Sequence, residues 1–130
     1  HAAIGIQQLN KIDKIKKKRQ SVCKKYFDNL SKIPWIFAPH GDLENVNPFL
    51  YYIRVLNGRR DSLREHMKKN GIDTGIHWQA GHNFSYLNSC KRFDLKITDK
   101  ITQEILSLPL HSDITNEDVE RIINAIESFD

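Results

Sequence analysis

The sequence has few of the features that mark secreted, membrane or metal-binding proteins. Its two cysteines, Cys23 and Cys90, fall in no metal-ligand spacing, and a secreted disulfide scaffold would carry more of them. Stretches without charge are short, such as residues 45–53, whereas a membrane helix needs about 20 apolar residues. No signal-peptide pattern is found near residue 1. These absences predict two reduced, half-buried thiols in a cytoplasmic protein with no membrane partner.

Motifs for several common chemistries are also missing. The sequence contains no serine nucleophile elbow, no Walker loop and no Rossmann glycine pattern. Gly71 and Gly75 follow an expected helix rather than a strand, so we interpret them as a helix cap and the start of a strand. The aromatic residues Trp35, Tyr51 and Tyr52 lack the basic neighbours of a base-stacking surface. We expect them in the core.

What the chain does have is the length and composition of one globular domain. It has 130 residues, of which 39% are hydrophobic and 28% are charged, which is too apolar for a disordered chain. We therefore expect a single domain over residues 1–130 with a core of its own.

Charge is spread unevenly along this chain. Residues 1–32 contain nine lysines and arginines and two acids, for a net charge of +7. The remaining 98 residues contain 11 bases and 14 acids, for a net charge of −3. Such asymmetry indicates either a nucleic-acid or membrane surface or a solvated helix face. The spacing of apolar residues favours the helix face.

Apolar residues in the first segment recur at steps of three and four. The spacing predicts one long amphipathic helix of roughly 28 residues, which ends before Pro34. Its apolar positions are Ile4, Leu9, Ile12, Ile15, Val22, Cys23, Tyr26, Phe27 and Leu30. The lysines occupy the other face.

The middle of the chain predicts strands and one helix. We expect a short strand from Trp35 and a buried strand over residues 49–56, followed by a turn at Asn57-Gly58. A helix over 61–70 is expected to end with Gly71 in a left-handed cap and Ile72 in a Schellman contact. A further strand is predicted over 74–78.

The last third predicts a loop, two helices and a short extended piece. Residues 79–96 form a long loop with one helical turn near 84–87. Thr98 is expected to cap a helix that carries Ile101 and Ile105, and residues 108–110 are expected to be extended.

Thr115 and Asp118 form a capping box for the final helix, with Ile114 and Val119 as its hydrophobic staple. Its buried stripe is Val119, Ile122, Ile123, Ile126 and Phe129. The element order predicts an α+β fold, in which a small, mostly antiparallel sheet has helices packed on one face and a long amphipathic helix precedes it.

Three histidines, His77, His82 and His111, are candidates for chemistry because imidazole titrates near neutral pH. His77 and His82 fall at the end of a predicted strand. Four residues separate them, which matches no zinc motif, and no cysteine or carboxylate joins them nearby. From the residues alone, the pair is either a structural, hydrogen-bonded pair or a substrate-facing one.

Three motifs carry a family resemblance. They are Ala2-Ala3-Ile4-Gly5-Ile6-Gln7-Gln8-Leu9, then Gly71-Ile72-Asp73-Thr74-Gly75-Ile76-His77-Trp78 with His82, then Ile105-Leu106-Ser107-Leu108-Pro109-Leu110-His111 with 115–119. They resemble, in order, the start of the connecting helix, the strand and loop near the sugar, and the closing signature of the DegT/DnrJ/EryC1/StrS nucleotide-sugar aminotransferases. The three matches span essentially all of residues 2–129.

The resemblance implies the C-terminal small domain of an enzyme with the aspartate-aminotransferase fold. Family members are pyridoxal-phosphate enzymes whose Schiff-base lysine lies in a large N-terminal domain, which is absent from this chain. The implied partners are that large domain, a second subunit in a homodimer and a nucleotide-sugar substrate. We therefore expect this chain to be inactive alone, with no pyridoxal phosphate bound, and the stripe of Ile4, Ile6 and Leu9 to be exposed, frayed or buried in an oligomer.

The resemblance also ranks the candidate site residues. His82 becomes the best candidate for a substrate-binding residue and His77 the second, with no catalytic, cofactor or metal residue assigned. Two departures from the family pattern are Pro48, where the family often has histidine, and residues 78–81, which replace a proline-rich, tyrosine-containing stretch. Two alternatives remain, a regulatory or dimerisation module of the same fold and a basic nucleic-acid-binding domain.

Overall fold

The computed structural model describes residues 1–129 and confirms the α+β class. The helices are α1 (Ala2–Leu9), α2 (Ile12–Leu30), α3 (Arg60–Lys69), α4 (Lys96–Glu104) and α5 (Asn116–Glu127), with short 3-10 turns η1 (Gly81–Asn83) and η2 (Ser85–Leu87). The strands β1 (Ile36–Phe37), β2 (Tyr51–Val55) and β3 (Ile105–Leu108) form an antiparallel sheet in the order β1-β2-β3. No helix within residues 1–129 is both long and apolar enough to cross a bilayer.

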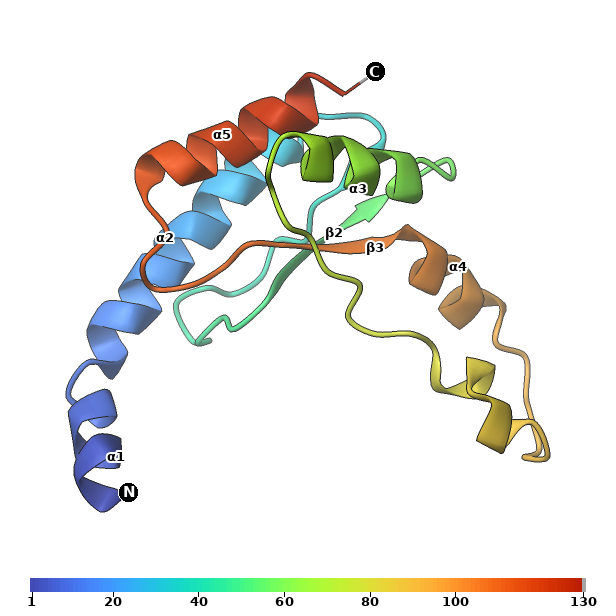
Figure 1. Cartoon of the computed structure of the whole chain (residues 1–130), viewed down its shortest axis with the longest axis horizontal. Helices are drawn as coiled ribbons and strands as arrows, with labels where there is room; N and C mark the ends of the chain where they lie inside the picture. Colours follow the sequence, from blue (N-terminus) through green and yellow to red (C-terminus); the bar gives the residue numbers. More distant parts are fainter. Residues whose placement is uncertain (130) are drawn as a thin grey trace.

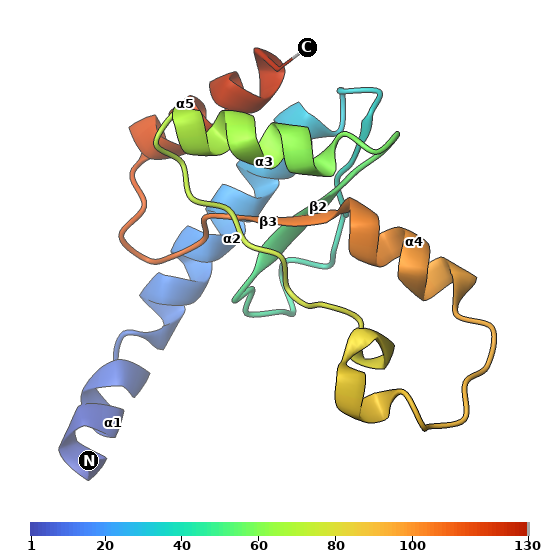
Figure 2. The same ribbon diagram turned by 45° about the vertical axis from the view of Figure 1, so that its right-hand side comes forward.

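Helices α2, α3 and α5 lie on one side of the sheet, and two segments project from this body (Figures 1 and 2). One is α1 with the first turns of α2. The other runs from η1 through α4 and leads back into β3. The body therefore supplies a rigid core, and the second projection carries His82 away from it.

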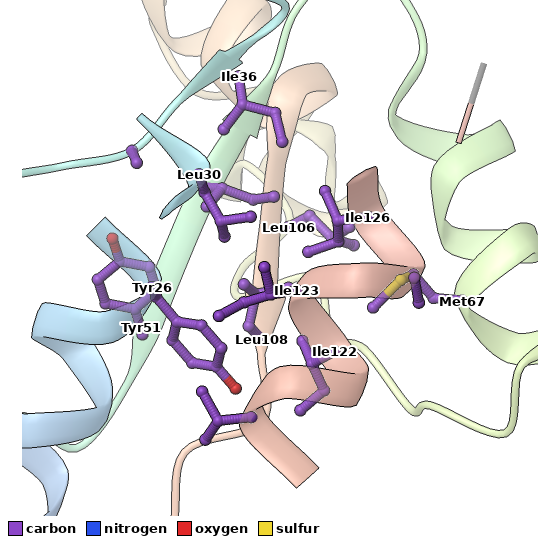
Figure 3. Close-up of a cluster of buried hydrophobic side chains, with 14 of the residues drawn as sticks. Tyr26, Leu30, Ile36, Tyr51, Met67, Leu106, Leu108, Ile122, Ile123 and Ile126 are labelled. Atoms are coloured by element: carbon purple, nitrogen blue, oxygen red, sulfur yellow. The ribbon is translucent and has the colours of Figure 1, made fainter. Parts of the chain in front are cut away.

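The core forms between the helices and one face of the sheet. Along β2 the side chains of Tyr51, Ile53 and Val55 are buried, and Ile53 pairs with Leu106 of β3, as a half-buried strand requires. Figure 3 shows this face with the side chains that meet it, among them Tyr26, Leu30, Met67, Leu108, Ile122, Ile123 and Ile126. Each fully buried aliphatic side chain contributes about 2 kcal/mol, so this cluster holds the domain together.

The other face of the sheet carries a charged pair. Arg54 donates from Nε and Nη2 to Oε2 of Glu104, at 2.9 and 2.6 Å. The guanidinium carbon of Arg54 also lies 5.4 Å from the ring centroid of Phe37. Glu104 is buried, so this pairing is what allows a carboxylate at the end of α4.

Local signals in the sequence place several boundaries correctly. Asn57 and Gly58 turn the chain with φ angles of 59° and 70°. Gly71 has a φ of 70°, and the Ile72 amide donates to Met67 O at 2.9 Å, which completes the Schellman motif.

The capping box at the start of α5 is also confirmed. Oγ1 of Thr115 accepts from the Asp118 amide at 3.0 Å, and the Asp118 carboxylate accepts from the Thr115 amide at 3.0 Å. The staple residues Ile114 and Val119 are both buried, as are all the predicted stripe residues except Phe129, which is half-buried.

The prediction of a single N-terminal helix is wrong, because this part of the chain forms two helices, α1 and α2. The break falls at Asn10 and Lys11, where the Lys11 amide donates to Gln8 O at 3.1 Å, one residue short of the α-helical partner. Asparagine is a poor helix former because its side chain competes for backbone groups. No residue of α1 is buried, so packing does not hold α1 in line with α2.

The strand predicted over 74–78 is also wrong. Only Gly75 pairs with β3: its amide donates to Ser107 O at 3.1 Å, and the Ser107 amide donates to Gly75 O at 2.8 Å. Further along the same edge, Arg60 donates to Ile105 O at 3.4 Å. The guanidinium thus takes the carbonyl that a longer strand would use.

Three smaller expectations are corrected near α4 and at the cysteines. The helix begins at Lys96, whose amide donates to Asp94 Oδ1 at 3.1 Å, so Thr98 is not its cap. Ile105 belongs to β3 rather than to the helix, and β3 includes only Leu108 of the extended piece predicted over 108–110. Cys23 is fully buried, with its pKa raised to about 11 by burial, and Cys90 is exposed; both are free thiols.

Candidate functional site

A concavity lies beside the outer edge of β3. It has a volume of about 560 Å³ and is bounded by residues 71–77 after α3, the end of β3, the loop that follows it and the start of α5. Its polar lining is Asp73, Thr74, His77, Ser107, His111, Asp118 and Arg121, and its apolar lining includes Leu50, Ile72, Leu108, Ile114 and Ile122. We call it the edge pocket. Its size suits a small-molecule ligand.

Two unpaired polar atoms line the edge pocket. Nδ1 of His77 and Oγ of Ser107 are buried without a hydrogen-bond partner among the described residues. The His77 ring folds back over Gly75, so closely that a Cβ on residue 75 would lie 2.2 Å from Cε1. A buried polar group without a partner is costly. Both atoms are sealed from solvent, so a ligand would reach them only after the side chains around them move.

The charge in the edge pocket is mixed. Hydrogen bonds from the Thr115 amide and hydroxyl lower the pKa of Asp118, and the charges of Arg121 and His111 lower it further. Arg121 is itself held in place, because Nη2 donates to the backbone oxygen of Asn70. A cation, two carboxylates, two imidazoles and two hydroxyls together suit a ligand that both donates and accepts hydrogen bonds.

His82, the first-ranked candidate from the sequence, does not line the edge pocket. It lies in η1 on the projecting segment, and its Nε2 is 2.6 Å from Oδ1 of Asp99 in α4. The side chain of His82 is 16% exposed, which leaves part of the ring accessible. The structure therefore brings His77 and His111 to one pocket and holds His82 apart from them.

Sequence reasoning missed three residues. Ser107 is hidden in an apolar strand motif, and Arg121 looks like an ordinary solvent-facing residue between buried helix positions. Asp99 is 17 residues from His82, and no spacing rule joins a 3-10 turn to a helix that follows a loop. In the part of the chain that the structure describes, no three side chains of the metal-binding types gather.

Several solved structures that share this fold are aminotransferases. TlmJ from Streptoalloteichus hindustanus matches 98% of this chain at 22% identity with a TM-score of 0.85. PseC from Helicobacter pylori, an aminotransferase involved in the biosynthesis of pseudoaminic acid, matches 98% of this chain at 23% identity with a TM-score of 0.84. NtdA from Bacillus subtilis, with bound cofactor PMP, matches 87% of this chain at 20% identity with a TM-score of 0.76. The chain spans 35%, 37% and 28% of their lengths.

The fold is thus that of one portion of an aminotransferase. At these identities the structural likeness establishes the fold alone, and the family comes from the sequence. Residues 1–127 match the DegT/DnrJ/EryC1/StrS aminotransferase family. The chain belongs to this family.

Proposed function

We propose that this chain is the C-terminal small domain of a pyridoxal-phosphate-dependent aminotransferase that acts on a nucleotide-linked keto-sugar. The observation that carries the proposal is the family match over residues 1–127. The role of PseC in pseudoaminic acid biosynthesis supports a sugar substrate. The chain spans 35% of TlmJ, which supports a larger domain as its partner in the whole enzyme. In this proposal the whole enzyme is a cytoplasmic homodimer.

The cofactor belongs to that larger domain in this proposal. Pyridoxal phosphate supplies an electron sink, and it needs a lysine, an acid beside its ring nitrogen and a phosphate cup. No lysine lines the edge pocket, so the pocket does not fit covalent attachment of the cofactor. The PMP bound to NtdA supports the same cofactor class for the whole enzyme.

The contribution of this chain is to bind and orient the substrate. His77 and Ser107 line the edge pocket and each carries a buried polar atom without a partner among the described residues, and His82 has an accessible ring edge on the projecting segment. A small domain that closes over a cofactor site can use such groups on the sugar or the diphosphate. His82 and His77 are the proposed substrate-binding residues.

Trapping with borohydride tests whether the cofactor is bound by the larger domain and not by this chain. The chain is mixed with pyridoxal phosphate, reduced and mapped by peptide mass spectrometry. We expect weak labelling spread over surface lysines and no aldimine absorbance at one site. Stoichiometric labelling of a single lysine would refute the assignment of the cofactor to another domain.

A second experiment tests the substrate-binding role in the complete enzyme. His77→Ala and His82→Ala are each expected to raise KM for the nucleotide-linked keto-sugar by about tenfold, which corresponds to the loss of one good hydrogen bond. The KM for the amino donor should stay unchanged. His40→Ala, at an exposed position outside the edge pocket, is the control.

A further inference from the structure

Asp99 holds one specific nitrogen of His82. The Nε2–Oδ1 distance of 2.6 Å is that of a short, charge-assisted hydrogen bond. The carboxyl of Asp99 is half exposed, at 52%, whereas the His82 side chain is 16% exposed. The pair ties η1 to the first turn of α4, so it fixes both the position and the rotation of the imidazole ring.

This contact also fixes where the proton of the ring lies. An ionised carboxylate only accepts hydrogen bonds, so Nε2 of His82 must carry the hydrogen. In a neutral imidazole the other nitrogen, Nδ1, is then an acceptor. Nδ1 of His82 has no hydrogen-bond partner within residues 1–129, and it is not among the atoms sealed from solvent.

We propose that Asp99 is a positioning residue that holds neutral His82 in the Nε2–H form, so that Nδ1 accepts a hydrogen bond from a hydroxyl of the bound sugar. This inference rests on the proposed function, because it assigns the part of the substrate that His82 contacts. A phosphate oxygen is an acceptor and does not pair with the Nδ1 lone pair, whereas a sugar hydroxyl donates to it. The pair thus selects the sugar rather than the diphosphate as the partner of His82.

Long-range proton–nitrogen NMR on this chain tests the tautomer without substrate or cofactor. We expect the wild-type His82 ring in the Nε2–H form above pH 7.5, with its signals assigned by their loss in His82→Gln. Asp99→Leu should give a mixture of the two tautomers, and Asp99→Glu should keep the Nε2–H form. Asp13→Leu, which removes an exposed acid from the first turn of α2, is the matched control and should change nothing.

Two results would overturn the positioning role. One is a wild-type ring in the Nδ1–H form, which is decisive even if a variant fails to fold. The other is an unchanged tautomer in a folded Asp99→Leu variant. A purely structural clip between η1 and α4 would lower stability in Asp99→Leu without moving the tautomer.

Kinetics of the complete enzyme test the hydroxyl contact separately. Asp99→Leu is expected to raise KM for the nucleotide-linked keto-sugar about fivefold and to have little further effect in His82→Ala. Asp99→Glu should restore most of the loss. If the tautomer result holds and KM does not move in either single variant, the hydroxyl contact is refuted while the family assignment stands.

Discussion

The imidazole of His77 occupies the space in which a side chain on residue 75 would begin. A Cβ built on Gly75 would lie 2.2 Å from Cε1 and 2.8 Å from Nδ1 of His77. Both separations are too short for any real contact between such atoms. Glycine at position 75 therefore allows the ring to fold back against the backbone beside the edge pocket.

Gly75→Ala should move the His77 ring. We expect changed His77 NMR signals and a loss in the free energy of unfolding of about 1 to 2 kcal/mol, as for other overpacked sites. Gly41→Ala is the control, because nothing lies within 4 Å of a Cβ there. Unchanged His77 signals in a folded Gly75→Ala variant would contradict the placement of the ring.

Two buried tyrosines provide a matched pair. Their rings lie 5.2 Å apart, but Tyr26 donates from its hydroxyl to Pro109 O at 2.9 Å, whereas the Tyr51 hydroxyl has no partner among the described residues. Tyr26→Phe should lower the free energy of unfolding by about 1 kcal/mol, and Tyr51→Phe should leave it unchanged or raise it. Urea denaturation measures both. Equal losses in the two variants would show that the hydroxyls have the same environment.

The capping box of α5 should appear in the stability of the chain at acid pH. Thr115→Ala should cost about 1 kcal/mol because an amide at the start of α5 loses its acceptor. Hydrogen bonds from Thr115 lower the pKa of Asp118 in the folded chain. The Asp118 carboxylate therefore makes its full contribution to the free energy of unfolding above the usual aspartate pKa. That contribution is lost as the pH falls through the lower pKa that Asp118 has in the folded chain.

The variant Asp118→Asn separates this carboxylate from the others. Its unfolding midpoint should fall less between pH 5 and pH 2 than that of the wild type. Some dependence on pH should remain, because hydrogen bonding also lowers the pKa values of Glu117 and Asp42. Parallel curves for the variant and the wild type would contradict the role of Asp118.

Helix α1 should exchange its amide hydrogens rapidly in a monomer. It has eight residues, none of them buried, and Ile4, Ile6 and Leu9 are 65%, 57% and 70% exposed. A helix this short is marginal in water unless something packs on it. Hydrogen exchange by mass spectrometry should show little protection over residues 5–9, in contrast to residues 22–30 of α2. Strong protection in a monomer of proven mass would contradict this expectation.

The parts of the fold that depend on neighbouring residues were predictable from the sequence. The Schellman motif needs only Gly71 and Ile72 beside a helix, and the capping box needs only Thr115 and Asp118. The strand β2 was predictable from the aromatic and β-branched residues that fill positions 49–56. Each of these signals depends on residues only a few positions apart, so it predicts the local structure without reference to the rest of the chain.

Two of the errors arise where another residue takes a backbone group that the predicted element would use. The strand expected after Thr74 stops because Arg60 takes a carbonyl on the edge of β3. Thr98 resembles a cap, but the Asp94 carboxylate accepts the Lys96 amide first. The link between His82 and Asp99 depends in the same way on the path of a loop, which no periodicity encodes.

The competition at the edge of β3 also affects how the chain behaves at high concentration. Sheets with a free outer row of amides and carbonyls invite strands from other molecules, which is a common route to aggregation. Here Gly75 pairs with Ser107 on one border, Arg60 binds Ile105 O beside it, and the opposite border is β1, which has two residues. The sheet thus offers a poor template for fibril growth, and concentrated samples should resist conversion to cross-β aggregates.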